Sequence, residues 1–351
     1  MIKLPGLIDI HTHLRTPGQE QKEDFYTGTS AAIAGGFTTI VDMPNNKTPI
    51  TTLDLLEEKI KLAEKEIVCD VGFHFGSMGD NLNQFQNINS MVFGLKLYLN
   101  PTTGNFLIDE EELRNIYNAW SGNQPIILHC EGETLSIALQ VIQKTRKPTH
   151  IAHVSSAEEL SIIISAKQEG LPITCGVTPH HLFLTEEDAK KLGAYGHMKP
   201  FLKTQTDVDF LWEHLDQIDI IESDHAPHTK AEKDSDNPPF GVPGLETTLP
   251  LLLTAVSEGK LSIEDVKRLC HTNPAKIFNI PTDPETFVEI DEDERYTIND
   301  KRLFTKCKWS PFDGWRVQGK IKAVFIRGTK VFEDGKVLAK KGSGKIISPT
   351  L

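Results

Sequence analysis

The sequence has few cysteines, and no pattern that would pair them. Its five cysteines, among 351 residues, are odd in number and scattered. Disulfide frameworks and structural zinc sites both need cysteines at short, repeated spacings. We therefore expect neither kind of cross-link, and this cysteine usage suits a reducing cytoplasm.

Long hydrophobic runs and an excess of basic residues are also missing. No apolar stretch approaches the roughly 20 residues that a membrane-spanning helix needs. The first residues, MIKLPGLIDIHTH, lack the basic and then apolar regions of a signal peptide. The 49 acidic residues outnumber the 37 basic ones, giving a formal net charge of −12, which disfavours binding to nucleic acid or to anionic membranes. We expect a cytoplasmic protein that binds neither.

Short apolar stretches alternate with amphipathic, helix-like stretches along most of the chain. The predicted strands cover residues 6–13, 37–43, 68–75, 92–99, 125–130, 149–154, 171–177 and 218–223. The clearest helical patterns between them cover residues 52–66, 109–120 and 157–170. This alternation predicts parallel strands with right-handed crossovers, and eight such units close into a (β/α)₈ barrel, the TIM-barrel fold. The alternative, an open doubly wound sheet that binds a dinucleotide, is disfavoured because no glycine-rich fingerprint follows any strand.

The composition changes after a helical pattern at residues 261–278. Residues 283–351 are polar and carry short strand-like pieces such as KAVFIRG and KVFEDGKVL. We therefore expect a barrel domain over residues 6–280. Residues 1–5 and 281–351 would form a small β-rich appendage.

Two histidines at the end of the first predicted strand are the first indication of chemistry. His11 and His13 are two residues apart, so both rings project from the same face of the strand, which Asp9 and Arg15 share. In a barrel this face points inward, and the strand ends at the mouth where active sites form. Two converging imidazoles are half of a metal site, although a single histidine in a core is usually structural.

Further polar residues fall in or at the ends of other apolar strands. They are Lys96, His129, His153 and Asp224. A structural role in the core would explain any one of these residues, but it does not easily explain the whole set on one rim of the barrel. A buried lysine among apolar residues is also costly unless its charge is neutralised or paired.

Longer motifs carry a family resemblance over nearly the whole chain. They are HTHLRTPGQEQKEDFYTGTSAAIAGG, VDMPNN, GLKLYLN, HCEG, IAHVSS, TPHHLFL, SDHAPH and PGLETTLPLLLTAVSEG, in family order. With these motifs the chain resembles the dihydroorotases of the amidohydrolase superfamily, above all the dihydroorotase domain of the multifunctional animal pyrimidine-synthesis protein. The resemblance implies reversible cyclisation of N-carbamoyl-L-aspartate to L-dihydroorotate, with loss of water.

The resemblance also implies a metal centre of two zinc ions. The implied ligands are His11, His13 and Asp224 for one ion, His129 and His153 for the other, and a carboxylated Lys96 that bridges both. Two metals that share a water would make a nucleophile at neutral pH. Asp224 would additionally carry a proton from water to the leaving nitrogen.

For the substrate, the resemblance implies that Arg15 and Asn45 hold the carboxylate of dihydroorotate and that His228 assists. The planar guanidinium of an arginine suits a carboxylate, although a surface ion pair is the ordinary alternative for Arg15. In the loop at residues 100–109, Thr102 would contact the substrate when the loop closes. An ordinary connection between strand and helix is the alternative for this loop.

The chain departs from the family pattern at several positions. Lys199 stands where the animal enzymes have a substrate-binding arginine, and Thr103 where their loop has a phenylalanine. A lysine keeps the charge but loses the planar fork of donors. Ala152 and Gly176 replace a cysteine and a glutamate that help some animal members to hold a third zinc, so we expect no third metal. The remaining histidines for which we expect supporting or packing roles are His180, His181, His225 and His271, and His74 has no assigned role.

Two other functions stay open at this stage. A related cyclic amidase, such as a hydantoinase or an allantoinase, would not need Arg15 and Asn45, since its substrates lack the carboxylate. A non-catalytic homologue that assembles with aspartate transcarbamoylase should have lost metal ligands, whereas all six positions are present here. The resemblance also implies a homodimer.

Overall fold

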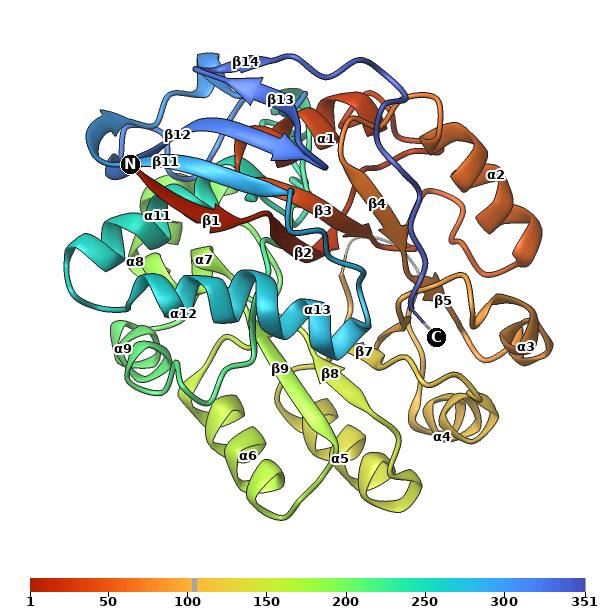
Figure 1. Ribbon diagram of the computed structural model, residues 1–351. Helices are drawn as coiled ribbons and strands as arrows, with labels where there is room; N and C mark the ends of the chain where they lie inside the picture. Colours follow the sequence, from red (N-terminus) through yellow and green to blue (C-terminus); the bar gives the residue numbers. More distant parts are fainter. Residues whose placement is uncertain (103–105, 351) are drawn as a thin grey trace.

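The computed structural model of the chain describes residues 1–102 and 106–350. Its centre is a closed barrel of parallel strands surrounded by helices (Figure 1). The barrel strands are β2 (Leu7–Thr12), β3 (Phe37–Asp42), β4 (Asp70–Phe73), β5 (Phe75–Gly76), β6 (Leu95–Tyr98), β7 (Ile126–His129), β8 (Thr149–Ile151), β9 (Ile173–Val177) and β10 (Ile220–Ile221). The predicted (β/α)₈ fold and the position of each predicted strand are confirmed.

Two local features close the barrel. Strands β4 and β5 are one barrel strand interrupted at His74, whose Nε2 lies 2.8 Å from the carbonyl oxygen of Ile10. The first and last strands meet where the backbone N–H of His13 donates to the carbonyl of His225 at 2.9 Å, beside a parallel bridge between Thr12 and His225. We call this junction of β2 with the chain after β10 the seam.

The helices follow the strands as the sequence pattern predicts, and side-chain caps fix several of their starts. The larger ones are α1 (Phe25–Ala34), α2 (Leu53–Ala63), α4 (Glu110–Ala119), α5 (Glu133–Thr145), α6 (Ala157–Gln168), α9 (Gln205–Glu213) and α11 (Leu245–Ser257). Asp109 and Ser156, for example, each accept a hydrogen bond from the backbone N–H three residues on, which satisfies a free helix donor. Shorter helices are α3 (Phe85–Ile88), α7 (Pro179–Phe183), α8 (Glu186–Leu192) and α10 (Lys230–Lys233), with 3₁₀ turns at Leu82–Gln84, Gly193–Gly196 and Asp300–Arg302.

The helical stretch predicted at residues 261–278 contains a break. It consists of α12 (Ile263–Lys267), one π-helical turn (Arg268–Thr272) and α13 (Asn273–Phe278). Phe278, at the end of α13, packs edge-on against the rings of His74 and His150. It belongs to a small apolar cluster inside the barrel, distinct from the larger core between strands and helices. We call this cluster the apolar floor of the barrel.

A second sheet lies against one side of the barrel. Its strands, all antiparallel, are β1 (Ile2–Pro5), β11 (Phe287–Thr297), β12 (Arg316–Ile326), β13 (Thr329–Glu333) and β14 (Lys336–Val337), in that order. The chain then returns to the barrel, where Ile347 donates a backbone hydrogen bond to Val71 beside β4 (Figure 1). The boundaries of the appendage, at residues 5 and 280, stay a prediction.

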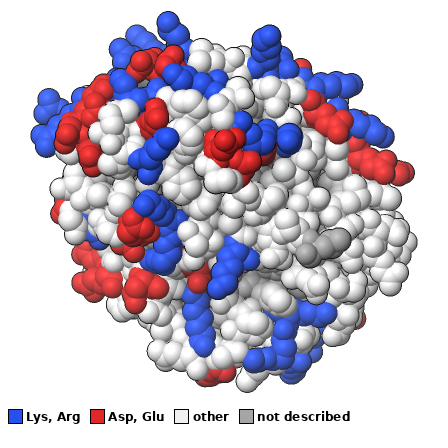
Figure 2. All heavy atoms as spheres, viewed as in Figure 1, with Lys and Arg blue, Asp and Glu red and all other residues white. Residues whose placement is uncertain are grey.

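The described surface has mixed charge. On the face shown in Figure 2, basic and acidic side chains lie interspersed, most densely over the appendage strands at the top. Within residues 1–102 and 106–350, no helix is long and apolar enough to cross a membrane.

Candidate metal centre

Most of the predicted site residues line one cavity at the mouth of the barrel. Its walls are His11, His13, Arg15, Asn45, Tyr98, Thr102, His129, His153, Lys199, Asp224, Ala226, Phe240 and Gly241. Of the residues predicted to bind metal or substrate or to act in catalysis, Lys96 and His228 do not line it. The structure thus brings together residues that are more than 200 positions apart in the chain.

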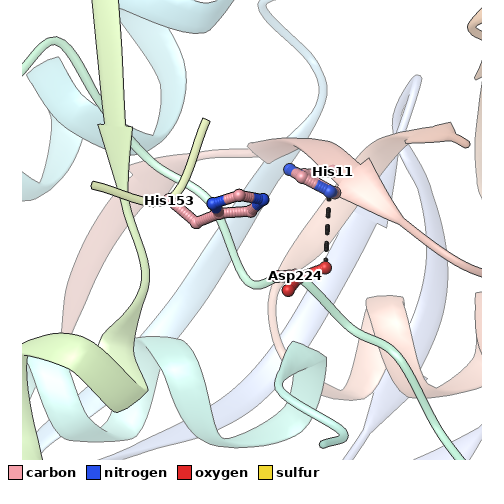
Figure 3. Close-up of side chains that lie close together, drawn as sticks. All are labelled: His11, His153 and Asp224. Atoms are coloured by element: carbon pink, nitrogen blue, oxygen red, sulfur yellow. Dashed lines mark ion pairs between the residues drawn. The ribbon is translucent and has the colours of Figure 1, made fainter. Parts of the chain in front are cut away.

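Three predicted ligands form the tightest group. Potential ligand atoms of His11, His153 and Asp224 all lie within 4.8 Å of one another. Figure 3 shows the two imidazoles and the carboxylate turned toward one another, with His11 Nε2 at 3.3 Å from Asp224 Oδ1. His153 and Asp224 both have left-handed backbone conformations, with φ of 40° and 43°. Such conformations are costly for residues other than glycine and collect at functional sites.

His13 completes this side of the cluster. Its Nε2 lies 3.0 Å from Asp224 Oδ1, and its Nδ1 lies 2.7 Å from Asn45 Oδ1. Because an amide oxygen only accepts hydrogen bonds, Asn45 places the ring proton on Nδ1 and leaves the lone pair of Nε2 facing the cavity. Burial lowers the pKa of His13 to about 4, so the ring is neutral at physiological pH, as a metal ligand must be.

The opposite side of the cluster is a histidine pair. His129 Nδ1 lies 2.9 Å from His153 Nε2, and the two ring centroids are 4.6 Å apart. The other nitrogen of His129, Nε2, lies 3.3 Å from a carboxylate oxygen of Glu131. Burial lowers the pKa of both histidines, so each offers a neutral nitrogen.

Lys96 lies below these histidines on β6. Its side chain is completely buried, and Nζ makes no hydrogen bond to any residue in the described ranges. The centroid of the Tyr98 ring lies 4.8 Å from Nζ. Burial lowers the pKa of Lys96 to about 8, because a charged amine is poorly solvated there.

The donor set fits a divalent metal. Burial alone would raise the pKa of Asp224, but His11 and His13 outweigh it and hold that pKa well below its usual range. The centre therefore offers an ionised carboxylate beside the neutral imidazoles of His13, His129 and His153, and these are oxygen and nitrogen ligands that zinc prefers. Among the buried polar atoms that make no hydrogen bond within the described part of the chain are His153 Nδ1 and Lys96 Nζ, both at this centre. Such orphaned atoms are expensive unless a ligand satisfies them.

A cationic group stands beside the cluster. Arg15 is buried, has a φ of 63° and donates from Nε to the carbonyl of Pro227 at 3.1 Å. One of its terminal nitrogens lies 3.2 Å from His228 Nε2. Burial lowers the pKa of His228, and its ring contacts Arg15 rather than the cavity. In the structure His228 therefore contacts Arg15 from the side away from the cavity and helps to hold it in place.

The loop that carries Asn45 is fixed by a buried ion pair that the sequence did not reveal. Lys59 Nζ lies 2.7 Å from Asp42 Oδ2 and donates to Asn46 Oδ1 at 2.9 Å. The other oxygen of Asp42 accepts from the backbone N–H of Leu14 at 2.7 Å. One carboxylate thus ties the Asn45 loop to the segment that leads to Arg15.

Lys199 and Thr102 lie on the rim of the cavity. Lys199 Nζ lies 3.8 Å from the ring centroid of Phe201 and 5.5 Å from that of Phe240. His181 Nε2, at 3.1 Å from the carbonyl of Pro200, fixes the segment that follows Lys199. Thr103, the other departure in the loop, lies outside the described residues.

The other histidines make mostly structural contacts. His225 accepts from the backbone N–H of Gly244 at 3.2 Å, and His271 contacts the carbonyl of Gly6 at 2.8 Å. His180 is buried beside His181, and its Nε2 has no hydrogen bond to the residues described here.

One buried carboxylate near the centre was missed. Glu222 directly follows β10 and is completely buried. Its carboxylate fills the space above Gly176, where an added Cβ would lie 2.6 Å from Glu222 Oε1. The only signal in the sequence was its place in IDIIES, a stretch in which it is one of two acidic residues among three isoleucines.

Comparison with known proteins identifies the family of the chain. The profile of the Amidohydrolase family matches residues 2–331, which is most of the chain. The chain belongs to the amidohydrolase family. Within it, the chain is 36% identical to a dihydroorotase of Pyrococcus abyssi, over 99% of this chain and 87% of that protein. It is 45% identical, over 98% of its length, to a multifunctional protein CAD of Squalus acanthias, of which it spans only 16%.

Solved structures of amidohydrolases share the fold. An L-hydantoinase (dihydropyrimidinase) of Arthrobacter aurescens superposes with a TM-score of 0.94 at 26% identity, covering 99% of this chain and 89% of that one. An inactive dihydroorotase-like domain of a CAD-like multifunctional protein from Chaetomium thermophilum gives 0.85 at 28% identity, covering 99% of both chains. These comparisons confirm the family resemblance found in the sequence.

Proposed function

We propose that this amidohydrolase is a dihydroorotase of pyrimidine biosynthesis that interconverts N-carbamoyl-L-aspartate and L-dihydroorotate. The observation that carries the proposal is that Arg15 and Asn45 line the same cavity as the cluster of histidines and Asp224. A cyclic amide with a carboxylate would place its ring at the cluster and its charge at the arginine. Lys199, on the rim, supplies a second positive charge for the same anion.

We propose a centre of about two zinc ions at the cluster. The ligands would be His11, His13 and Asp224 on one side, His129 and His153 on the other, and carboxylated Lys96 between them. The chemistry that such a pair supplies is the activation of water at neutral pH and the polarisation of a carbonyl. Histidine nitrogens and carboxylate oxygens are its usual ligands.

Carboxylation of Lys96 is supported by the surroundings of its amine. The neutral form of Nζ can attack carbon dioxide, so that a C–N bond forms and a proton leaves, and the product is an anionic carbamate. A pKa of about 8 makes that neutral form accessible near physiological pH. Lys96 Nζ has no hydrogen-bond partner among residues 1–102 and 106–350, and carboxylation would turn this buried amine into an anion among potential metal ligands.

The residues around the cavity have separable tasks. In ring opening, Asp224 takes the proton from the attacking water and returns it to the amide nitrogen as the C–N bond breaks, and ring closure reverses both transfers. Arg15 offers its planar donors to the substrate carboxylate. Because the oxygen of Asn45 already accepts from His13, its amide N–H groups are left for that same carboxylate. Thr102 would contact the substrate as its loop closes and excludes water.

The other functions are weaker. The hydantoinase resembles this chain in fold, but a buried arginine beside the cluster is better explained by an anionic substrate than by a neutral ring. A non-catalytic role, as in the inactive dihydroorotase-like domain, should have left gaps among the ligands, and all six positions are kept. A cytoplasmic location, a homodimer and assembly with aspartate transcarbamoylase are secondary proposals.

Metal content and substrate preference test the proposed function directly. The purified protein should hold about two zinc ions per chain and should hydrolyse dihydroorotate in preference to hydantoin and allantoin. Turnover of hydantoin or allantoin without turnover of dihydroorotate would favour the cyclic amidase. No turnover of any of the three with both metals bound would favour the non-catalytic homologue.

Replacing Arg15 with methionine should weaken dihydroorotate binding selectively. A charge-assisted hydrogen bond contributes roughly 1.5–3 kcal/mol, so kcat/KM for dihydroorotate should fall about 10- to 100-fold. Turnover of dihydrouracil, which has the ring but no carboxylate, should change much less. The exposed Arg114, replaced in the same way, is the matched control, and an equal loss for both substrates would argue against carboxylate recognition.

A further inference from the structure

A layer of polar side chains lies beneath the proposed metal centre and has no task in the mechanism above. It contains the buried Glu222 and His150 and the half-buried Thr174. Glu222 and His150 are completely buried, and His150 packs on Phe278 of the apolar floor. The layer therefore separates the floor of the barrel from the ligands.

Within this layer Glu222 contacts two proposed ligands at once. Its Oε1 accepts a hydrogen bond from the backbone N–H of His153, the residue with the left-handed conformation. Its Oε2 lies 3.3 Å from His11 Nδ1 and 3.5 Å from His150 Nε2. In the proposed centre His11 and His153 belong to different metal positions, so one carboxylate touches the residues that hold both.

His11 is bracketed by two carboxylates. Its Nε2 faces Asp224 in the cavity, and its Nδ1 faces Glu222 below it. A ligand histidine needs its proton on the nitrogen that does not bind the metal, and a carboxylate opposite that nitrogen holds the proton there. None of His11 Nδ1, His150 Nε2 and Glu222 Oε2 makes a regular hydrogen bond to a described residue, so their mutual contacts are the ones that compensate their burial.

The neighbouring strand makes room for this carboxylate. An added Cβ at position 176 would lie 2.6 Å from Glu222 Oε1 and 3.0 Å from His150 Nε2. The glycine thus allows a glutamate just after the last barrel strand to reach across to β8. The other ring nitrogen of His150, Nδ1, is 2.9 Å from the hydroxyl of Thr174 on β9, which keeps Nε2 turned toward Glu222.

We infer that Glu222 is a positioning residue that holds the proton of His11 on Nδ1 and fixes the backbone of His153, and so prepares both metal positions. The inference rests on the metal centre of the proposed function. It assigns Glu222 no contact with substrate. Its negative charge below the ligands also favours a divalent cation above them.

Replacing Glu222 with glutamine tests this role with little change in size. The amide would present a donor toward the Nδ1 proton of His11, so zinc affinity should fall about 10- to 100-fold, the usual effect of removing such an outer partner. The measurement is zinc affinity by competition with a chromophoric chelator. Glu246→Gln is the matched control, because Glu246 is a half-buried carboxylate that also accepts backbone hydrogen bonds, from Phe304 and Thr305. It lies away from the cavity and should leave zinc affinity unchanged.

The tautomer of His11 gives a second readout that needs no metal. In the metal-free wild-type protein, nitrogen NMR should show the His11 proton on Nδ1, and in the E222Q variant it should shift toward Nε2. A proton on Nε2 in the wild type overturns the inference even if the variant does not fold. Unchanged zinc affinity in E222Q overturns it as well.

Two further outcomes separate this inference from the proposed function. A wild type that binds no zinc refutes the metal centre, whereas the tautomer measurement still reports on Glu222. The wild type could instead bind a third zinc ion. If E222Q lost only that ion and kept its affinity for the other two, Glu222 would be a ligand rather than a positioning residue.

Discussion

Replacing Lys96 with alanine should give a protein that folds but holds little zinc and hydrolyses dihydroorotate about a thousandfold more slowly than the wild type. Metal catalysis of this kind contributes several kcal/mol to the barrier, and each 1.36 kcal/mol is a factor of ten in rate. The alanine removes the proposed bridge while leaving the five other ligands in place. Folding should survive, because a buried amine without a hydrogen-bond partner in the described structure is replaced by an apolar group.

The measurements are zinc per chain and kcat for dihydroorotate, with Lys144→Ala on the exposed face of α5 as the control. Carbon dioxide dependence is the sharper test of the carbamate. Metal-stripped wild-type protein should regain activity with zinc and bicarbonate, but only slowly with zinc in carbonate-free buffer. Full activity and full zinc content in K96A would refute the bridging role.

Replacing Asp224 with asparagine should lower kcat by about 10²- to 10⁴-fold, because a general base contributes that much and an amide cannot take up the proton. The substitution keeps the size of the side chain and its position between His11 and His13. The second proposed metal position, at His129 and His153, does not include Asp224 and should keep its zinc. The loss in rate should therefore exceed the loss in metal content.

Steady-state kinetics and metal analysis of the same preparation separate these effects. Asp216→Asn, on the exposed surface, serves as the control. If kcat of D224N stayed within tenfold of the wild type, Asp224 could not be the proton carrier. If all zinc were lost, the variant would report on binding alone, and kcat would have to be measured at saturating zinc.

The regular part of the fold was predictable because the strands are short apolar runs and most of the long helices begin at a side-chain cap such as Asp109 or Ser156. The interruptions within a helix and a strand could not be predicted. The π-helical turn at Arg268–Thr272 lies in a stretch whose local pattern is helical throughout. The interruption at His74 depends on a contact with Ile10, a residue on another strand.

The same distinction holds for the site. Residues that carry their own chemical signal, such as His11 and His153, could be found in the sequence, and the structure places them together. Glu222 could not be assigned, because its position depends on the absence of a side chain at Gly176, on a different strand. Lys59 was likewise invisible, because on α2 it occupies one position of an ordinary amphipathic helix and only the fold brings it to Asp42.

The seam of the barrel affects the stability of the whole domain. It joins the beginning of the chain to a strand end more than 200 residues later, and few backbone hydrogen bonds connect the two edges. Asp9 strengthens it by accepting from the backbone N–H groups of both His11 and Ser223. A metal ion held by His11, His13 and Asp224 would link the two edges of the seam. Zinc binding would then add to the stability of the closed barrel, and without zinc the seam would depend on a few hydrogen bonds.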